Sequence, residues 1–407
     1  MSVMSVMAPV EPSDDELAAW LHLLHSAGTG RESARRLLAG FGSPQAVLDA
    51  SSARRAGFVA ADAATALSHP PAGHAQRLVD TLAWRSAAPG RRVMVLGDAD
   101  YPPLLLHTAD PPLLLYLQGR VDLLHAASVA IVGSRLPSAQ GLDNARQFAH
   151  ALSRQGWTVV SGLAAGIDGA AHDGALSGTL AAPPGGSTVA VIGTGIDRVY
   201  PASNKALAHR IAQHGLIVSE MPLGTPPLAA NFPQRNRLIA GLTRGTLVVE
   251  AALRSGSLIT ARLAAEAGRE VMAMPGSVLS RQSQGCHTLI RQGAVLVESV
   301  EQVLEELNAL PPLMTAAPPN PKPGLAGRDA AETSTKTSTK TSAKAVGSPA
   351  ATDPVLQALG HDPLSMDALV ERCGWPVHTL SAHLLTLELD GQVARLPGGL
   401  YQRRQAA

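Results

Sequence analysis

Arginine, amide and aromatic side chains are concentrated in one segment of the sequence, residues 226–262. Five arginines lie there against a single carboxylate, Glu250, although the whole chain of 407 residues has a formal net charge of only +1. Within it, the heptapeptide NFPQRNR (231–237) sets a phenylalanine ring beside two guanidinium groups and amide side chains. Guanidinium groups bind phosphates, amides bind base edges or sugars, and a ring offers a face on which a base stacks. The segment predicts a site for a polyanionic strand; a solvated helix start with ordinary surface arginines is the alternative.

Lysine is almost absent from the first three quarters of the chain. Lys205 is the only lysine before Lys322, because arginine is used at every other such position. A lone lysine can mark a position where a point charge on a flexible stem is wanted. Codon drift is the simpler alternative.

Short turns rich in glycine and hydroxyl groups follow several apolar runs that read as strands. These turns are Gly133-Ser134-Arg135, Ser161-Gly162, Gly193-Thr194-Gly195 and Ser255-Gly256. In an open α/β sheet the ligand crevice lies beyond the carboxyl ends of the strands, where free helix N-termini suit phosphates. A single glycine turn usually only lets a strand and a helix pack closely. Several such turns together with Arg135, Lys205, Arg235 and Arg237 predict an anion-binding rim.

Motifs for several other chemistries are missing from the sequence. It has no GxxxxGK[ST], GxSxG, HExxH or CxxC motif, and Gly133-Ser134-Arg135 departs from the GxGxxG dinucleotide fingerprint. Cys286 and Cys373 are too far apart for a disulfide framework or a metal knuckle. We therefore expect no catalytic residue, no metal and no cofactor. Asp168 and His172 could form an acid/base pair, but their one-turn spacing favours a local hydrogen bond that orders their helix.

Apolar, β-branched runs alternate with helical patterns from Ser128 onward. The runs cover residues 129–132, 158–160, 188–192, 216–218, 246–249, 271–274 and 294–297. Such runs, each followed by a glycine turn and a helix, are typical of a parallel sheet covered on both faces. Two short strands, 93–96 and 113–117, precede them. The fold class expected for residues 91–310 is α/β, with a Rossmann-like parallel sheet as its core.

Two smaller modules are predicted to flank this domain. Residues 13–90 begin with a capping box and read as short helices joined by glycine turns, like a sterile-alpha-motif (SAM) or helix-hairpin-helix domain that binds DNA backbone or is purely architectural. Residues 353–407 predict a winged helix. Its recognition helix, 377–386, lacks Lys and Arg, which favours protein contact or structural support over duplex DNA. Residues 1–12 and the Pro/Thr/Lys-rich linker 311–352 are expected to be disordered.

The sequence does not predict membrane insertion or secretion. No window of about 18 uninterrupted apolar residues predicts a membrane span. Residues 1–10 lack the basic start and the apolar length of a secretory leader. The two distant cysteines suit a reducing compartment, so the expected location is the cytoplasm.

Several of these stretches occur together, in one order, in a known family. GSR, SGLAAGIDGAAHDGAL, IGTGIDRVYP, FPQRNRLIAGL, VVEAALRSGSLITARLAAEAGREVMAMPG and LIRQGA closely resemble the DNA-processing protein A family, called DprA or Smf. The resemblance covers nearly the whole chain apart from residues 1–12 and the linker, and it is strongest over 128–298. One departure is His287, which stands where the family usually has the amide of a GTN motif.

The resemblance implies a non-enzymatic protein that binds single-stranded DNA entering the cell during natural transformation. Such proteins protect the strand from nucleases, load the RecA recombinase onto it and form homodimers through the Rossmann-like domain. The family's DNA pocket would fall on Arg135, Ser161, Gly162, Lys205, Phe232, Arg235, Asn236 and Arg237. The neighbouring rim residues Gly133, Ser134, Ser255 and Gly256 complete the predicted DNA-binding site.

Two other functions compete with this prediction. Nucleotide hydrolases of the lysine-decarboxylase-like (LOG) group resemble the same domain and need a glutamate close to a glycine-rich helix start. Ser255-Gly256-Ser257 would be such a start, and Glu266 is the nearest glutamate after it. A transcription regulator acting through the winged helix is the third possibility, weakened by the missing cations of that module.

Overall fold

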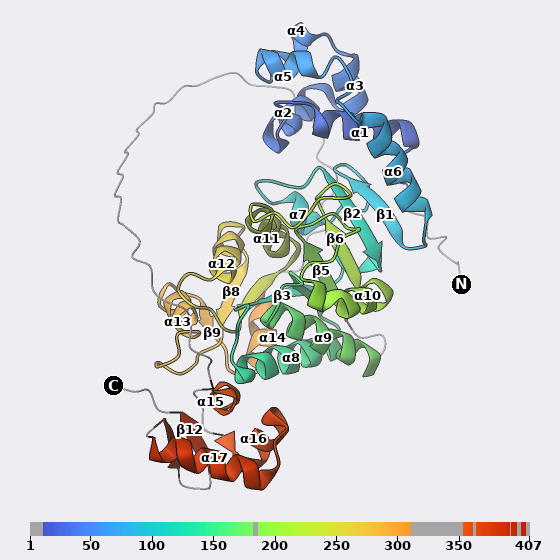
Figure 1. The fold of residues 1–407 in the computed structure, drawn as a ribbon. Coiled ribbons are helices and arrows are strands. Elements are labelled where there is room, and N and C mark those ends of the chain that lie inside the picture. The colour runs from blue at the N-terminus through green and yellow to red at the C-terminus, as the bar shows by residue number, and fades with distance from the viewer. Residues whose placement is uncertain are drawn as a thin grey trace, which may run out of the picture. The chain divides into compact units, whose positions relative to one another are not determined.

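The computed structural model describes residues 11–181, 186–310, 353–360, 364–390, 392–396 and 400–403. They belong to two compact units that divide between Pro311 and Pro312 (Figure 1). The predictions of disorder for residues 1–12 and 311–352 lie outside the described residues, except at Glu11 and Pro12. Among the described residues, no helix is long and apolar enough to cross a membrane.

A nine-stranded sheet, ordered β1-β2-β6-β5-β4-β3-β7-β8-β9, forms the centre of the first unit (Figure 1). From β3 the chain runs outward through β4 and β5 to β6, then returns to β7 on the other side of β3. The stretch β5-β4-β3-β7-β8-β9 is parallel and has the Rossmann strand order, which confirms the predicted fold class. The bounds are β1 Arg91–Val95, β2 Leu114–Gly119, β3 Ser128–Val132, β4 Thr158–Ser161, β5 Thr188–Ile192, β6 Leu216–Ser219, β7 Gly245–Val248, β8 Glu270–Ala273 and β9 Val295–Leu296.

The two strands predicted before the Rossmann-like region extend its sheet. β1 and β2 pair antiparallel with each other, and β2 pairs antiparallel with β6. They therefore continue the sheet beyond the parallel strands, and the segment between them passes the carboxyl end of β6.

Helices cover both faces of the sheet because alternate side chains of each strand point to opposite sides. In β3, Val129 and Ile131 share a core with α8 and α9, whereas Ala130 and Val132 share another with α11 and α12. The helices are α7 Pro103–Leu106, α8 Ala139–Arg154, α9 Ile167–Ala181, α10 Lys205–His214, α11 Asn231–Leu242, α12 Gly256–Glu266, α13 Gln284–Arg291 and α14 Val300–Ala309, with 3₁₀ turns η1 Val121–Leu124 and η2 Ala202–Asn204.

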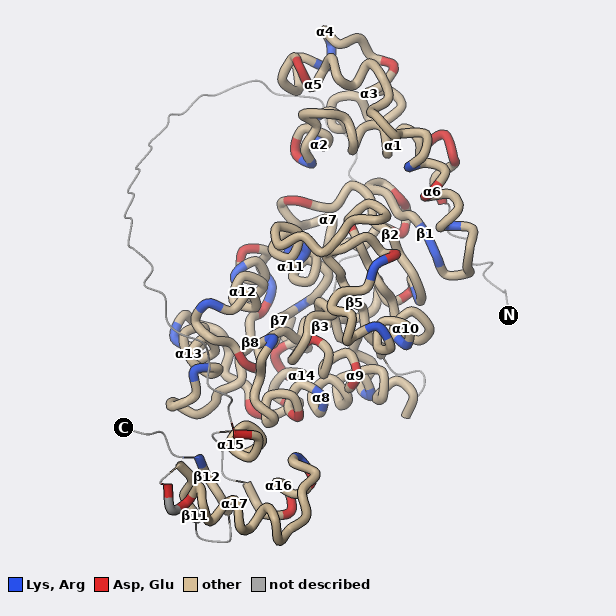
Figure 2. The backbone as a smooth tube through the Cα atoms, viewed as in Figure 1, with Lys and Arg blue, Asp and Glu red and all other residues tan. Residues whose placement is uncertain are grey.

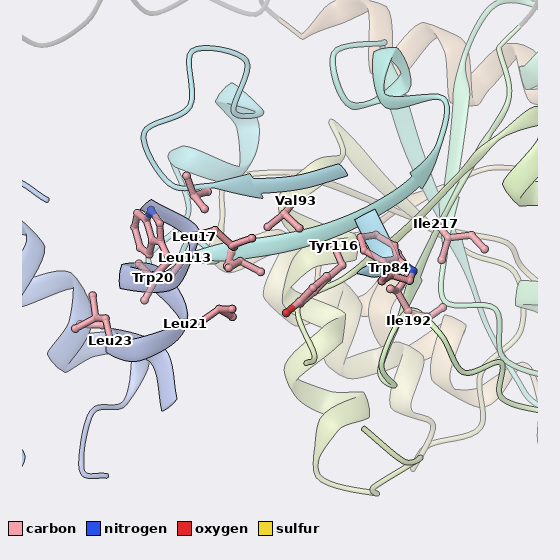
Figure 3. Packing of buried hydrophobic residues seen from close by; sticks show 14 of the residues in the cluster. Leu17, Trp20, Leu21, Leu23, Trp84, Val93, Leu113, Tyr116, Ile192 and Ile217 are labelled. Atoms are coloured by element: carbon pink, nitrogen blue, oxygen red, sulfur yellow. The ribbon is translucent and has the colours of Figure 1, made fainter. Parts of the chain in front are cut away.

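The N-terminal helices pack against the β1–β2 end of the sheet. They are α1 Asp14–His25, α2 Arg31–Phe41, α3 Pro44–Asp49, α4 Ser52–Arg55, α5 Ala61–Ala66 and α6 His74–Ser86. The predicted cap is present, since the Ser13 hydroxyl accepts a hydrogen bond from the Glu16 amide. Leu17 and Trp20 of α1 belong to the same buried cluster as Val93 of β1 and Tyr116 of β2 (Figure 3). The helical module and the sheet thus share one hydrophobic core.

The second unit has the predicted winged-helix composition. It contains α15 Pro354–Leu359, α16 Met366–Cys373 and α17 Val377–Leu389 with the three-stranded sheet β10-β12-β11, formed by Leu364–Ser365, Leu400–Arg403 and Val393–Leu396. Leu356, Leu369, Leu380, Leu384 and Tyr401 are buried together in its core. The recognition helix α17 carries no Lys or Arg on any face (Figure 2).

Candidate nucleic-acid interface

A cavity of about 710 Å³ opens at the carboxyl ends of β3 and β7. These neighbouring strands are the point where the chain reverses direction across the sheet, which is where open α/β sheets bind ligands. The walls come from the loop after β3, the first turns of α11 and the start of α12. The polar and aromatic lining residues are Ser134, Arg135, Asp168, Tyr200, Phe232, Arg235, Asn236, Arg254, Ser255, Ser257, Thr260 and Gln282.

An aromatic platform forms one side of this cavity. The Phe232 ring of α11 lies 5.6 Å from the Tyr200 ring, centroid to centroid, and the Arg135 guanidinium carbon lies 5.6 Å from the Phe232 centroid. Gly193 leaves room for this ring, because a Cβ there would lie 3.1 Å from a Phe232 ring carbon. Tyr200 is 46% exposed and Arg135 is also exposed. Two rings and a cation are therefore presented together to the solvent.

Arg235 lies at the floor of the cavity and is buried. Its Nη1 donates a hydrogen bond of 2.8 Å to the carbonyl oxygen of Val191, at the end of β5. Burial lowers the pKa of Arg235 to about 10, while the nearby Asp168 carboxylate favours the charged form. The side chain therefore stays cationic at neutral pH. Gly162 makes room for it, since a Cβ at that position would lie 1.6 Å from Nη1.

Asp168 and His172 hold the loop after β4. The Asp168 carboxylate accepts hydrogen bonds from the amides of Gly162 (3.2 Å) and Ala164 (3.3 Å). His172 Nε2 accepts one from the Leu163 amide at 3.2 Å. Leu163 has a left-handed φ of 58°, an uncommon conformation that these bonds keep in place. The prediction of a hydrogen bond between Asp168 and His172 is wrong, because each side chain accepts hydrogen bonds from backbone amides of the loop instead.

The surroundings of His172 favour its neutral form. Burial lowers its pKa to about 3, and the charge of Arg235 acts in the same direction. Because Nε2 accepts from an amide, the remaining proton lies on Nδ1, which donates to the Thr188 hydroxyl at 2.6 Å. Burial disfavours the charged form of Asp168 as well and so raises its pKa, although Arg235 and the loop amides act in the opposite direction.

The start of α12 supplies the opposite wall. Ser255 is its N-cap, and the hydroxyls of Ser255 and Ser257 lie 2.7 Å apart. The Asn236 side-chain amide of α11 donates to the Gly256 carbonyl at 3.4 Å, which links the two walls. The partly positive N-terminus of an 11-residue helix, with the exposed Arg254 beside it, is suited to an anion.

Comparison with known proteins assigns the chain to one family. Residues 92–308 match the model for the DNA recombination-mediator protein A, and residues 339–399 match that for the DprA winged helix domain. The chain belongs to the DprA/Smf family. It is 37% identical to protein Smf of Escherichia coli over 388 residues, which are 95% of this chain and 96% of that protein. The resemblance expected from the sequence is thereby confirmed.

Two comparisons with Streptococcus pneumoniae DprA agree with this assignment. Its sequence is 49% identical over 212 residues, covering 52% of this chain and 72% of that protein. Its X-ray structure superposes with a TM-score of 0.59 at 36% identity, covering 73% of this chain and 99% of that one.

Most of the residues of the predicted DNA-binding site, taken from the family's pocket and from the neighbouring rim, line the cavity. Gly133, Ser134, Arg135, Phe232, Arg235, Asn236, Ser255 and Gly256 all do so. Ser161 does not, because it is fully buried and its hydroxyl donates to the Ile131 carbonyl. Gly162 lies against Arg235 behind the cavity surface. Lys205 is exposed at the first residue of α10, five residues after Tyr200, and is outside the lining.

Arg237 is directed away from the cavity. Its Nη2 lies 2.5 Å from a Glu220 carboxylate oxygen and its Nε lies 3.1 Å from Asp110. The sequence pattern predicted Arg237 in the same rim as Arg235, but in the structure Arg237 forms ion pairs on another side of α11.

Several lining residues were missed as site candidates, among them Tyr200 and Gln282. Tyr200 had a signal, since the VYP stretch follows a strand of the sheet. Gln282 had none; its amide donates to the Leu136 carbonyl at 2.8 Å and joins the loop before α13 to the loop after β3. His287 is half-buried, is bonded to the Gly276 carbonyl at 3.0 Å and does not line the cavity.

The cavity does not offer what a LOG-type hydrolase needs. Glu266 pairs with Arg262 at 3.4 Å on an exposed part of α12 and does not line the cavity. Asp168, the acidic residue of the lining, already accepts hydrogen bonds from two backbone amides. Within the part of the chain that the structure describes, no group of three metal-binding side chains occurs.

Proposed function

We propose that this chain is a non-enzymatic single-stranded DNA-binding protein and that the cavity between β3 and β7 holds the strand. The observation that carries the proposal is the platform of Tyr200, Phe232 and Arg135, in which two rings and a guanidinium face one opening. A base stacks on an aromatic face whatever its identity, so the platform would bind many sequences. Bases of a duplex are already stacked and paired, which favours the single strand.

The remaining groups of the cavity suit the backbone of the same strand. Arg135, Arg254 and the N-terminus of α12 would contact phosphates, and Arg235 would supply a buried positive charge behind them. The Asn236 and Gln282 amides would reach sugars or base edges. Lys205, exposed on α10 beyond Tyr200, would hold a phosphate of the strand as it leaves the cavity.

Membership of the family extends the proposal to its partners. We infer that the protein protects incoming DNA in the cytoplasm during natural transformation, loads the RecA recombinase onto it and acts as a homodimer. The matching of residues 92–308 to a recombination-mediator family supports the recombination role. A groove of about 730 Å³ between α12 and α13, lined by Leu258, Ile259 and Leu289, supports a protein contact on the Rossmann-like domain. Sedimentation of the purified chain tests the dimer, and RecA filament formation on protein-coated DNA tests the loading.

Salt dependence of binding tests the site directly. We expect fluorescence anisotropy to show tight binding of an oligo-dT strand and weak binding of duplex DNA. Arg135→Ala and Lys205→Ala should each reduce the slope of log Kobs against log salt by about 0.7, the value for one phosphate contact on a single strand.

Arg154→Ala is the matched control for these variants. Arg154 is an exposed arginine in the last turn of α8, at the opposite edge of the sheet from the cavity. Its loss should leave the slope unchanged. Equal slopes for Arg135→Ala, Lys205→Ala and the control would refute the assigned phosphate contacts. Release of free base from nucleoside monophosphates would refute the non-enzymatic role.

A further inference from the structure

Five charged side chains from four segments form one network beside α11. Arg237 of α11 contacts Glu220, which follows β6, and Asp110, which precedes β2. Arg31 and Arg35 of α2 contact the same Asp110: Arg31 Nη2 lies 2.9 Å from its Oδ2, and the Arg35 guanidinium pairs with its Oδ1. Arg31 Nη1 also lies 3.8 Å from Glu220. We call this set of five residues the α2–α11 network.

The network is partly withdrawn from water. The Glu220 side chain is 9% exposed and that of Arg237 is 14% exposed, whereas Arg35, Asp110 and Arg31 are 23%, 29% and 34% exposed. Burial opposes the ionisation of Asp110, but Arg237, Arg31 and Arg35 together hold its pKa below the usual value. Paired charges in such surroundings interact strongly and become costly when one partner is removed. The network is therefore a firm connection between α2 and α11.

The connection ends on the helix that forms the cavity wall. Arg235 and Asn236 line the cavity, and Arg237 is the next residue of the same helix. Arg31 also donates to the Gln234 side chain at 3.1 Å, so α2 contacts α11 directly as well as through Asp110 and Glu220. A change in the position of α2 relative to the sheet would be passed through these contacts to α11 and to its Phe232 side chain.

We propose that Arg237 is a positioning residue of the single-stranded DNA site and that, through Asp110 and Glu220, the N-terminal helical module sets the orientation of α11. Arg237 does not touch the strand in this arrangement. The inference rests on the proposed function of the cavity and adds a role for the helical module, whose position determines how well the cavity fits DNA.

Neutralising Glu220 distinguishes positioning from direct binding by the sign of the effect. If Arg237 were a phosphate ligand restrained by Glu220, Glu220→Gln would release a cation, remove a negative charge and raise the affinity for oligo-dT. With Arg237 as a positioning residue, the same variant loosens α11 and lowers the affinity roughly tenfold. The control is Glu266→Gln, which removes an equal charge from an exposed pair on α12 and should change the affinity by less than about twofold.

Variants of both helices test the connection itself. Arg237→Ala should lower the affinity roughly tenfold without changing the salt slope, whereas Arg135→Ala should flatten it. The double variant Arg31→Ala/Arg35→Ala, on α2, should weaken binding in the same way. Combined with Arg237→Ala it should add little, because all three arginines share Asp110. Arg237→Lys should recover only part of the affinity, since a single ammonium cannot bridge two carboxylates as a guanidinium does.

Three results would overturn the proposal: a rise in affinity in Glu220→Gln, a flattened slope in Arg237→Ala, or full affinity in Arg31→Ala/Arg35→Ala. Failure of the unmodified chain to bind oligo-dT would instead refute the proposed function. Hydrogen exchange of the free full-length protein still tests the connection in that case. The α11 amides should exchange faster in Arg31→Ala/Arg35→Ala than in the unmodified protein, and unchanged exchange would overturn the positioning role.

Discussion

The floor and the mouth of the cavity use similar side chains in opposite ways. At the floor, Arg235, Asp168 and His172 are buried and bonded to backbone groups. At the mouth, Arg135 and Tyr200 are exposed, and each lies against the ring of Phe232. Floor residues fix the shape of the backbone, whereas mouth residues can exchange water for a ligand. Changes at the floor should therefore appear mainly in stability and changes at the mouth mainly in affinity.

The largest expected effect is at Gly162 in the floor. In Gly162→Ala the added methyl would overlap the Arg235 guanidinium, displace a buried charge and break its bond to Val191. We expect urea unfolding to show a loss of about 3 kcal/mol, with DNA binding lost as well. Gly256→Ala is the control for stability, because a Cβ there meets nothing within 4 Å. Unchanged stability in Gly162→Ala would show that the floor is not rigid.

A smaller effect is expected from acidification of the floor. The folded pKa of His172 is depressed to about 3, below the ordinary 6.5, so the unfolded chain binds the proton more readily. Its contribution to stability is present in full above pH 6.5 and is lost as the pH falls towards 3. From pH 7 to pH 5 this one group should cost about 2 kcal/mol in the free energy of unfolding. Urea titrations at both pH values measure it.

The matched variants for this pH effect are His172→Gln and His209→Gln. The first should remove about 2 kcal/mol of the pH dependence. The second replaces an exposed histidine of α10 and should retain the pH dependence of the unmodified chain. An identical pH profile for all three proteins would contradict the assignment to His172.

The smallest effect is expected at the mouth. Tyr200→Ala removes an exposed ring on which a base would stack, and should reduce the affinity for oligo-dT by about 1 kcal/mol. The midpoint of the urea unfolding transition should not change, since the Tyr200 side chain is 46% exposed. Tyr200→Phe keeps the ring and should bind like the unmodified chain. A stability loss in Tyr200→Ala without a loss of affinity would reverse the distinction between floor and mouth.

The fold was predictable because its strands are buried on both faces. Runs such as 129–132 and 189–192 are wholly apolar for that reason, and the turns after them lie at the carboxyl edge where the cavity is found. The winged helix was likewise predictable from its helix and turn signals. In these cases a local sequence pattern and the tertiary environment agree.

The two arginines of the heptapeptide show where sequence alone was insufficient. Residues two apart on a helix do not face each other, and here Arg235 lines the cavity whereas Arg237 forms ion pairs on another side of α11. Arg237 is held on its side of α11 by Asp110 and Glu220. These two residues are distant in sequence, and no local pattern predicts that they pair with Arg237. The turn pattern predicted that Gly162 lies beside a bound phosphate. In the structure the missing side chain of Gly162 makes room for Arg235 instead.

The reversal of the chain across the sheet affects the order in which the protein acquires its site during synthesis. Gly133–Arg135 are made early, but the opposite wall follows only after the chain has passed β6 and returned to β7. A ribosome-bound chain that has not yet released Ser255–Ser257 has half a cavity. For the proposed function, the site is complete only after translation has carried the polypeptide back over its own first β–α unit.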